Sequence, residues 1–170
     1  APVPRTPGPA IEAADGGLTV ALGLNGAAVG LELSLAAARP PVLQGDDGYS
    51  QKGEAADNAS AYYSITRMPT AGRLRVGDEI HEVTGSSWFD REWGTSFLAP
   101  GVVGWDWFSL QLDDGRDLMV YRLRDDEGGS TRFSAGTLVE PVAGGGVTWH
   151  RLGAGDVRLE PRDHWTSPRT

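Results

Sequence analysis

The sequence predicts an all-β fold in which an antiparallel meander curls into a β-barrel, complete or incomplete. Its 24 glycines and 11 prolines are spread along 170 residues, which is typical of short strands joined by turns. Strong helix formers never accumulate over the length of a helix, and apolar residues alternate with polar ones at period two around Asn25 and Gly26. A meander hides its edges by closing into a barrel or by packing as a sandwich, and we favour the barrel.

The first strands are predicted as a hairpin. Residues 1–17, with four prolines among the first nine, are typical of an extended entry segment or linker, and residues 18–170 form the β domain. Asn25-Gly26 is a typical two-residue hairpin turn. This turn predicts three apolar pairs on one face: Leu22 with Val29, Val20 with Leu31, and Leu18 with Leu33.

A Gly- and Asp-rich loop over residues 44–53 is predicted next, as a plain surface crossover. The strands that follow are expected at residues 61–67, 73–76, 79–83 and 86–93, with turns at 70–72 and 77–78. This arrangement places Arg73 opposite Glu82.

The remaining strands are predicted around two further turns. Strands 105–112 and 116–124 are joined at Asp114-Gly115, and this turn pairs Phe108 with Tyr121 on one face and Trp107 with Arg122 on the other. Weaker strands are expected at residues 131–140, 146–152 and 157–160, with a glycine turn at 144–146.

Composition excludes several classes of function. The net charge is −8 and Lys52 is the single lysine, so nucleic-acid binding is not expected. No apolar run is long enough for a transmembrane helix, and there is no cysteine for a disulfide or a thiolate site. The three histidines, His81, His150 and His164, are too far apart in sequence for a typical metal motif, so we expect no metal site. The sequence contains no nucleotide fingerprint and no phosphate loop, so we expect no cofactor.

Candidate catalytic acids lie within a cluster of aromatic residues. Seven of the 14 aromatic residues fall between Trp88 and Phe108. Strand alternation places Asp90 and Glu92 on the face of Trp88, where burial and mutual repulsion raise the pKa of a carboxyl group and keep it protonated as a general acid. Asp106, between two tryptophans, is a third candidate. The alternative is that each acid is paired with an arginine.

The same cluster supplies candidate ligand-binding residues. Indole faces stabilise a cationic intermediate, and Gln111 is a candidate for holding water. The alternative for each aromatic residue is an ordinary core position. The predicted ligand-binding residues are Trp88, Trp93, Trp105, Trp107, Gln111 and Tyr121.

Two tryptophan-rich runs, at residues 88–94 and 104–115, resemble the AttH-like family, which is similar to carotenoid hydratases (hydroxyneurosporene synthases) and to lipocalin-like fungal Diels–Alder cyclases. Shorter matching pieces lie at residues 43–46, 48, 52–53, 62–64 and 165–168. The resemblance implies a lipocalin-like domain that is a fragment of a longer two-domain protein, without its opening strands and its second lipocalin-like domain. Secretion or a periplasmic location is favoured by this resemblance alone.

Three functions stay open. The resemblance implies binding of an extended apolar or isoprenoid-like molecule, with acid-catalysed hydration or cyclisation. The alternatives are a noncatalytic carrier or interaction domain whose tryptophans pack against the second barrel, and the secreted hydrolase that family members are often named. The chain departs from the family pattern at Arg91, where many members have histidine, and at Glu92, so neither a histidine relay nor a carotenoid substrate is carried over.

Overall fold

The computed structural model describes residues 10–14, 17–23, 29–94, 98–160 and 162–168. The elements of secondary structure in these residues are all β-strands. The prediction of an antiparallel all-β fold is confirmed. The first sheet contains β1 (Ala10–Ala14), β2 (Gly17–Gly23), β3 (Val29–Ala36), β4 (Val42–Leu43), β5 (Tyr49–Gln51), β6 (Ala59–Val76) and β7 (Glu79–Gly94). The second contains β8 (Val102–Gln111), β9 (Asp117–Asp125), β10 (Ala135–Pro141) and β11 (Val147–Leu152).

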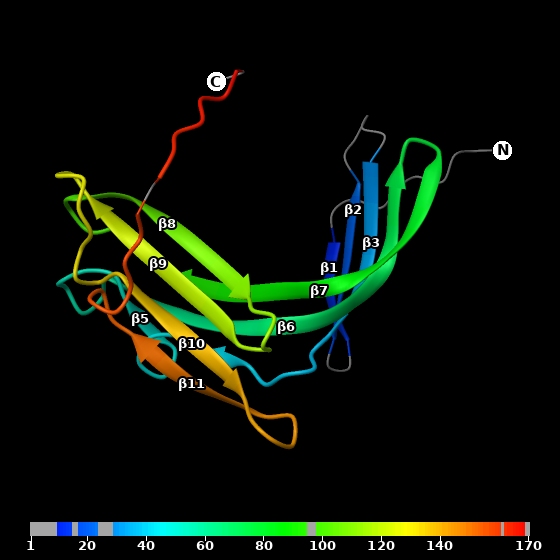
Figure 1. Ribbon diagram of the computed structural model, residues 1–170, viewed down its shortest axis with the longest axis horizontal. Helices are drawn as coiled ribbons and strands as arrows, with labels where there is room; N and C mark the ends of the chain where they lie inside the picture. The colour runs from blue at the N-terminus through cyan, green and yellow to red at the C-terminus, as the bar shows by residue number, and fades with distance from the viewer. Residues whose placement is uncertain (1–9, 15–16, 24–28, 95–97, 161, 169–170) are drawn as a thin grey trace.

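The long β6–β7 hairpin runs across the whole molecule (Figure 1). At one end it pairs with β3, and at the other it lies beside the second sheet. The predicted turn at 77–78 is confirmed, with Gly77 at φ 63°, and so is the pairing of Arg73 with Glu82, whose Nε and Oε1 lie 2.8 Å apart. The predicted turn at 70–72 is wrong, because β6 continues through it.

Gly72 explains that continuity. A Cβ at Gly72 would lie 2.0 Å from the carbonyl oxygen of Glu32 on β3. A glycine within a strand often marks such a close backbone approach rather than a turn. Two predicted strands, 61–67 and 73–76, are therefore one.

The β2–β3 hairpin is confirmed, but its predicted register is wrong by two residues. Leu22 pairs with Leu31, Val20 with Leu33 and Leu18 with Leu35. A shift of two keeps each side chain on its predicted face, because strand side chains alternate with period two. The predicted turn residues, Asn25 and Gly26, lie outside the described residues. β1, within the segment predicted as an entry or linker, pairs with β2.

The β8–β9 hairpin is also confirmed, but its register is wrong by one residue. The connecting loop has three residues rather than two, since the Leu112 N–H donates to the Arg116 carbonyl over 2.8 Å and Gly115 takes a φ of 87°. Trp107 therefore pairs with Tyr121, not with Arg122. A one-residue slip exchanges the two faces, so Trp107 and Tyr121 share a face.

The two sheets pack against each other without closing into a barrel. Within the described residues β7 pairs with β6 alone and β8 with β9 alone, so both are sheet edges. The core between the sheets consists of Tyr62, Met119, Tyr121 and Leu123, with Trp88, Val102, Phe133 and Ala135 packed around it. Residues 157–160, predicted as a strand, are not a strand in the structure.

The loop over residues 44–53 is not the surface crossover that the sequence predicts. It contains β5, and three of its polar side chains, those of Gln44, Ser50 and Lys52, are buried. Gln44 Oε1 accepts a hydrogen bond from Thr137 Oγ1 at 2.5 Å, and Ser50 Oγ lies 3.2 Å from the Tyr121 hydroxyl. The loop therefore joins the first sheet to the second.

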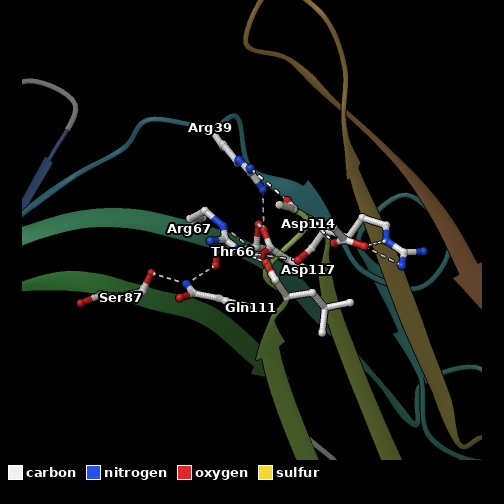
Figure 2. A network of polar contacts seen from close by, with 10 residues as sticks. Arg39, Thr66, Arg67, Ser87, Gln111, Asp114 and Asp117 are labelled. Atoms are coloured by element: carbon white, nitrogen blue, oxygen red, sulfur yellow. Dashed lines mark hydrogen bonds and ion pairs between the residues drawn. The ribbon is translucent and has the colours of Figure 1, made fainter.

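A buried polar network forms a second connection between the sheets (Figure 2). The Asp117 side chain has no exposed surface, and its carboxylate accepts hydrogen bonds from Arg39 at 2.6 Å, Thr66 at 2.7 Å and Arg67 at 2.7 Å. Beside it, Gln111 Nε2 donates to the Thr66 carbonyl at 2.8 Å. Neither a group of residues suited to a metal ion nor a helix suited to crossing a membrane occurs in the described part of the chain.

Candidate functional site: an aromatic cleft between the sheets

A cleft of about 300 Å³ lies between the two sheets. The first sheet and the loop after β5 contribute Lys52, Tyr62 and Glu92, and the second sheet contributes Trp105, Trp107, Tyr121 and Leu123. Most of this lining is aromatic or apolar, with two charged side chains among it. Such a composition is typical of a site for an apolar small molecule that is oriented by a few polar groups.

The register of β6 and β7 places both predicted acids on one face. Glu92 pairs with Tyr62, and Asp90 pairs with Ser64. Side chains of paired residues point to the same face of a sheet, and residues two apart on a strand share a face. The four side chains therefore lie on one face of β6 and β7, and this face borders the cleft because Tyr62 lines it.

Glu92 is held at the wall of the cleft by two hydrogen-bonding partners. Its Oε1 lies 3.1 Å from Lys52 Nζ and accepts a hydrogen bond from Ser60 Oγ at 2.5 Å. Lys52 Nζ also lies 3.9 Å from the centre of the Tyr121 ring, a cation–π contact. The Lys52 side chain is 7% exposed and that of Glu92 is 31% exposed, so the ammonium group is buried while the carboxylate is partly open to water.

Asp90 lies on β7, two residues before Glu92, and is not part of the cleft lining. Its carboxylate accepts hydrogen bonds from Ser64 Oγ and from Trp88 Nε1 at 2.9 Å, and it interacts electrostatically with the Tyr62 hydroxyl. Burial raises the pKa of the Asp90 carboxyl above its usual range, and the interactions with Ser64, Trp88 and Tyr62 oppose this rise without cancelling it.

Tyr62 connects Asp90 with the cleft. Trp107 Nε1 donates to the Tyr62 hydroxyl oxygen over 3.2 Å, and the Tyr62 hydroxyl interacts electrostatically with the Asp90 carboxylate. Burial, with the Asp90 charge next in size, raises the pKa of Tyr62 far above its usual range. Tyr62 therefore stays a neutral hydroxyl that can pass a proton between Asp90 and a molecule in the cleft.

The structure brings some of the predicted ligand-binding residues together and separates others. Trp105, Trp107 and Tyr121 line the cleft. Trp88 packs against the core beside it. Trp93 lies on the other face of β7 and meets Tyr63 edge to face, with ring centres 6.2 Å apart.

Asp106 and Gln111 also lie outside the cleft lining. Asp106 faces away from its tryptophan neighbours, and its Oδ2 accepts hydrogen bonds from Arg122 Nη2 at 2.6 Å and Nε at 2.9 Å. This is the arginine pairing considered as the alternative. Gln111 donates to the carbonyls of Thr66 and Ser87, so its side-chain amide joins β8 to the β6–β7 hairpin (Figure 2).

Three residues of the cleft were not predicted from the sequence: Lys52, Tyr62 and Leu123. Lys52 carries a signal that sequence reasoning could have used, because it is the single lysine of the chain and follows a Gly- and Asp-rich segment. Leu123 carries none, since its place depends on the β8–β9 register.

The two antiparallel sheets, with no helix among the described residues, form a lipocalin-like fold. The chain belongs to the AttH-like family, whose model matches residues 10–170. None of the curated proteins compared with the chain matched it.

Two solved structures are similar to the chain. An AttH protein from Nitrosomonas europaea is 33% identical with a TM-score of 0.81, and the match covers 92% of this chain and 47% of that one. Kievitone hydratase from Nectria haematococca is 18% identical with a TM-score of 0.60, and the match covers 91% of this chain and 54% of that one. The hydratase thus shares the fold, and this chain spans about half the length of the two structures.

Proposed function

We propose that the cleft binds an extended apolar, isoprenoid-like molecule and that Asp90 acts as the acid in the addition of water to a carbon–carbon double bond. The observation that carries the proposal is the position of Tyr62, which lines the aromatic cleft and interacts with Asp90, a carboxyl group whose pKa is raised by burial. The fold shared with a protein named kievitone hydratase agrees with this type of reaction.

The proposed reaction has two bond-forming steps. Protonated Asp90 gives its proton to the Tyr62 oxygen while the Tyr62 hydroxyl proton moves to one alkene carbon, where the π electrons form the new C–H bond. The neighbouring carbon becomes a cation that faces the indoles of Trp105 and Trp107. A water oxygen then bonds to that carbon and loses a proton to Glu92, and exchange with solvent returns this proton to Asp90.

The reaction is tested by replacing Asp90. Asp90→Asn should lower turnover of terpenoid alkenes about 100-fold or more, because an amide is not an acid that can supply the proton. Mass spectrometry detects the gain of one water by the alkene, and tryptophan fluorescence measures binding, which should persist. Glu82→Gln, on the same strand but at the exposed end of the hairpin, is the matched control and should react like the wild type. Equal turnover in Asp90→Asn and the wild type would remove Asp90 from the acid role.

A noncatalytic carrier or interaction domain is the second candidate. Trp105 is 57% exposed on β8, a strand with an unpaired edge in the described structure, and the similar AttH protein is about twice as long as this chain. These observations suit a tryptophan surface covered by a second domain. Ligand binding without product from any alkene in the panel would favour this candidate.

A further inference from the structure

We propose that Lys52 and Glu92 together recognise a hydroxyl group, so that the cleft selects an apolar molecule that carries an alcohol over the matching ether or carboxylic acid. The inference deepens the proposed function, since it assumes that the cleft binds an apolar ligand. It does not depend on the Asp90 reaction.

The backbone fixes the position of Lys52. The residue follows β5 directly, and its N–H donates to the Asn58 carbonyl over 2.8 Å, which closes the short loop before β6. Alternation along the strand places its side chain on the same face as Ser50, whose hydroxyl lies beside Tyr121. Lys52 therefore points toward the second sheet rather than toward solvent.

The Lys52 ammonium group keeps donor capacity for a ligand. An ammonium group has three N–H donors. Among the described residues one carboxylate oxygen, Glu92 Oε1, lies within ion-pair distance of Nζ, and Nζ also makes cation–π contacts with the rings of Tyr121 and Tyr62, at 3.9 and 5.5 Å. Aromatic rings attract the positive charge, but they leave N–H groups free to donate a hydrogen bond to an oxygen atom in the cleft.

The pair has the hydrogen-bonding pattern that complements a hydroxyl group. Lys52 is a donor without acceptor capacity, and the Glu92 carboxylate is an acceptor. An alcohol oxygen accepts from Lys52 while its proton is donated to Glu92. An ether oxygen accepts but donates nothing, and a carboxylate brings a second negative charge beside Glu92. Both therefore leave one half of the pair unsatisfied or repelled.

The rest of the cleft fits the apolar part of such a molecule. Its remaining lining, four aromatic residues and Leu123, begins directly beside the ion pair. A ligand with one alcohol group and an unsaturated hydrocarbon chain thus meets its polar end at Lys52 and Glu92 and its apolar body at Trp105 and Trp107.

The test compares three ligands with the same hydrocarbon chain: geraniol, geranyl methyl ether and geranate. Tryptophan fluorescence titration of the wild type should give geraniol an affinity about tenfold or more above the other two, the effect of one hydrogen bond to a charged group. Lys52→Met should abolish this preference. Glu92→Gln, which keeps Lys52, should improve geranate binding relative to the wild type, because the repelling charge is gone. Arg73→Met removes an exposed ion pair between β6 and β7, outside the cleft, and should keep the wild-type preference.

Any other result overturns the inference. The results also distinguish a failure of the inference from a failure of the proposed function. Equal binding of all three ligands to the wild type, or tightest binding of geranate, would reject hydroxyl recognition and leave an apolar binding site intact. An undiminished preference in Lys52→Met would also reject it. Binding of none of the three would reject both the inference and the proposed function.

Discussion

At the scale of single residues, Asp90 and Glu92 lie two positions apart on β7 and have different surroundings. Glu92 lines the cleft and is paired with Lys52 at 3.1 Å. Among the described residues Asp90 forms no ion pair with an arginine or lysine, and it accepts hydrogen bonds from the uncharged groups of Ser64 and Trp88. Paired carboxyl groups whose environments differ in this way are typical of sites that divide acid and base roles.

The environment of Asp90 predicts how stability depends on pH. Burial raises the pKa of the folded-state carboxyl above the unfolded value of about 3.9, so its stabilising contribution is present below that value and is lost as pH rises through the folded-state pKa. Asp90→Asn stays neutral at every pH. The free energy of unfolding of this variant relative to the wild type should therefore increase as pH rises above about 4. Urea unfolding at a series of pH values measures the difference.

The control for this prediction is Asp114→Asn. Hydrogen bonds from Arg116 lower the pKa of the exposed Asp114 carboxyl, so this replacement should show a small change of opposite sign with pH. A flat or falling difference for Asp90→Asn would show that burial does not dominate at Asp90.

At the scale of elements, the sequence predicts most strands and the faces of their side chains, but it does not predict every register. Period-two alternation identifies the β2–β3 hairpin, and an error of two residues leaves its faces unchanged. The β8–β9 hairpin shows the limit. A two-residue turn at Asp114-Gly115 and a three-residue turn are both compatible with the local sequence, and the choice between them decides whether Trp107 lies beside Tyr121 or beside Arg122.

The local sequence pattern also does not predict which polar residues are buried. The segment around Lys52 has the composition of a surface loop, yet Gln44 and Ser50 are buried because their partners, Thr137 and Tyr121, lie on distant strands. Because such partners are far apart in sequence, the alternation of residues and the composition of turns do not predict these contacts. For the same reason they do not predict the role of Asp117.

Asp117 joins elements that are distant in sequence, and its removal should destabilise the fold. Asp117→Asn leaves Arg39 and Arg67 without their buried carboxylate, and we expect the free energy of unfolding to fall by about 3 kcal/mol. Asp114→Asn, in the same hairpin, breaks an exposed ion pair and should cost far less stability than Asp117→Asn. Equilibrium urea unfolding gives both values. Similar losses in the two variants would show that the buried network does not hold the sheets together.

At the scale of the whole molecule, two open sheets are held face to face, and the cleft lies where their inward faces meet. Lys52 and the β6–β7 hairpin supply one wall, and β8 and β9 supply the other. The register that places Trp107 beside Tyr121 is what makes the second wall aromatic. The account depends on this cleft being the place where an apolar molecule binds.

The indole N–H signals of the six tryptophans test that claim most directly. In a ¹H–¹⁵N spectrum recorded during titration with geraniol, the signals of Trp105 and Trp107 should shift with a common saturation curve, because both indoles line the cleft. Those of Trp149 and Trp165, which are exposed and outside the cleft lining, should stay in place. Saturable shifts of Trp149 or Trp165 with unmoved signals of Trp105 and Trp107, or no saturable shift at all, would contradict it.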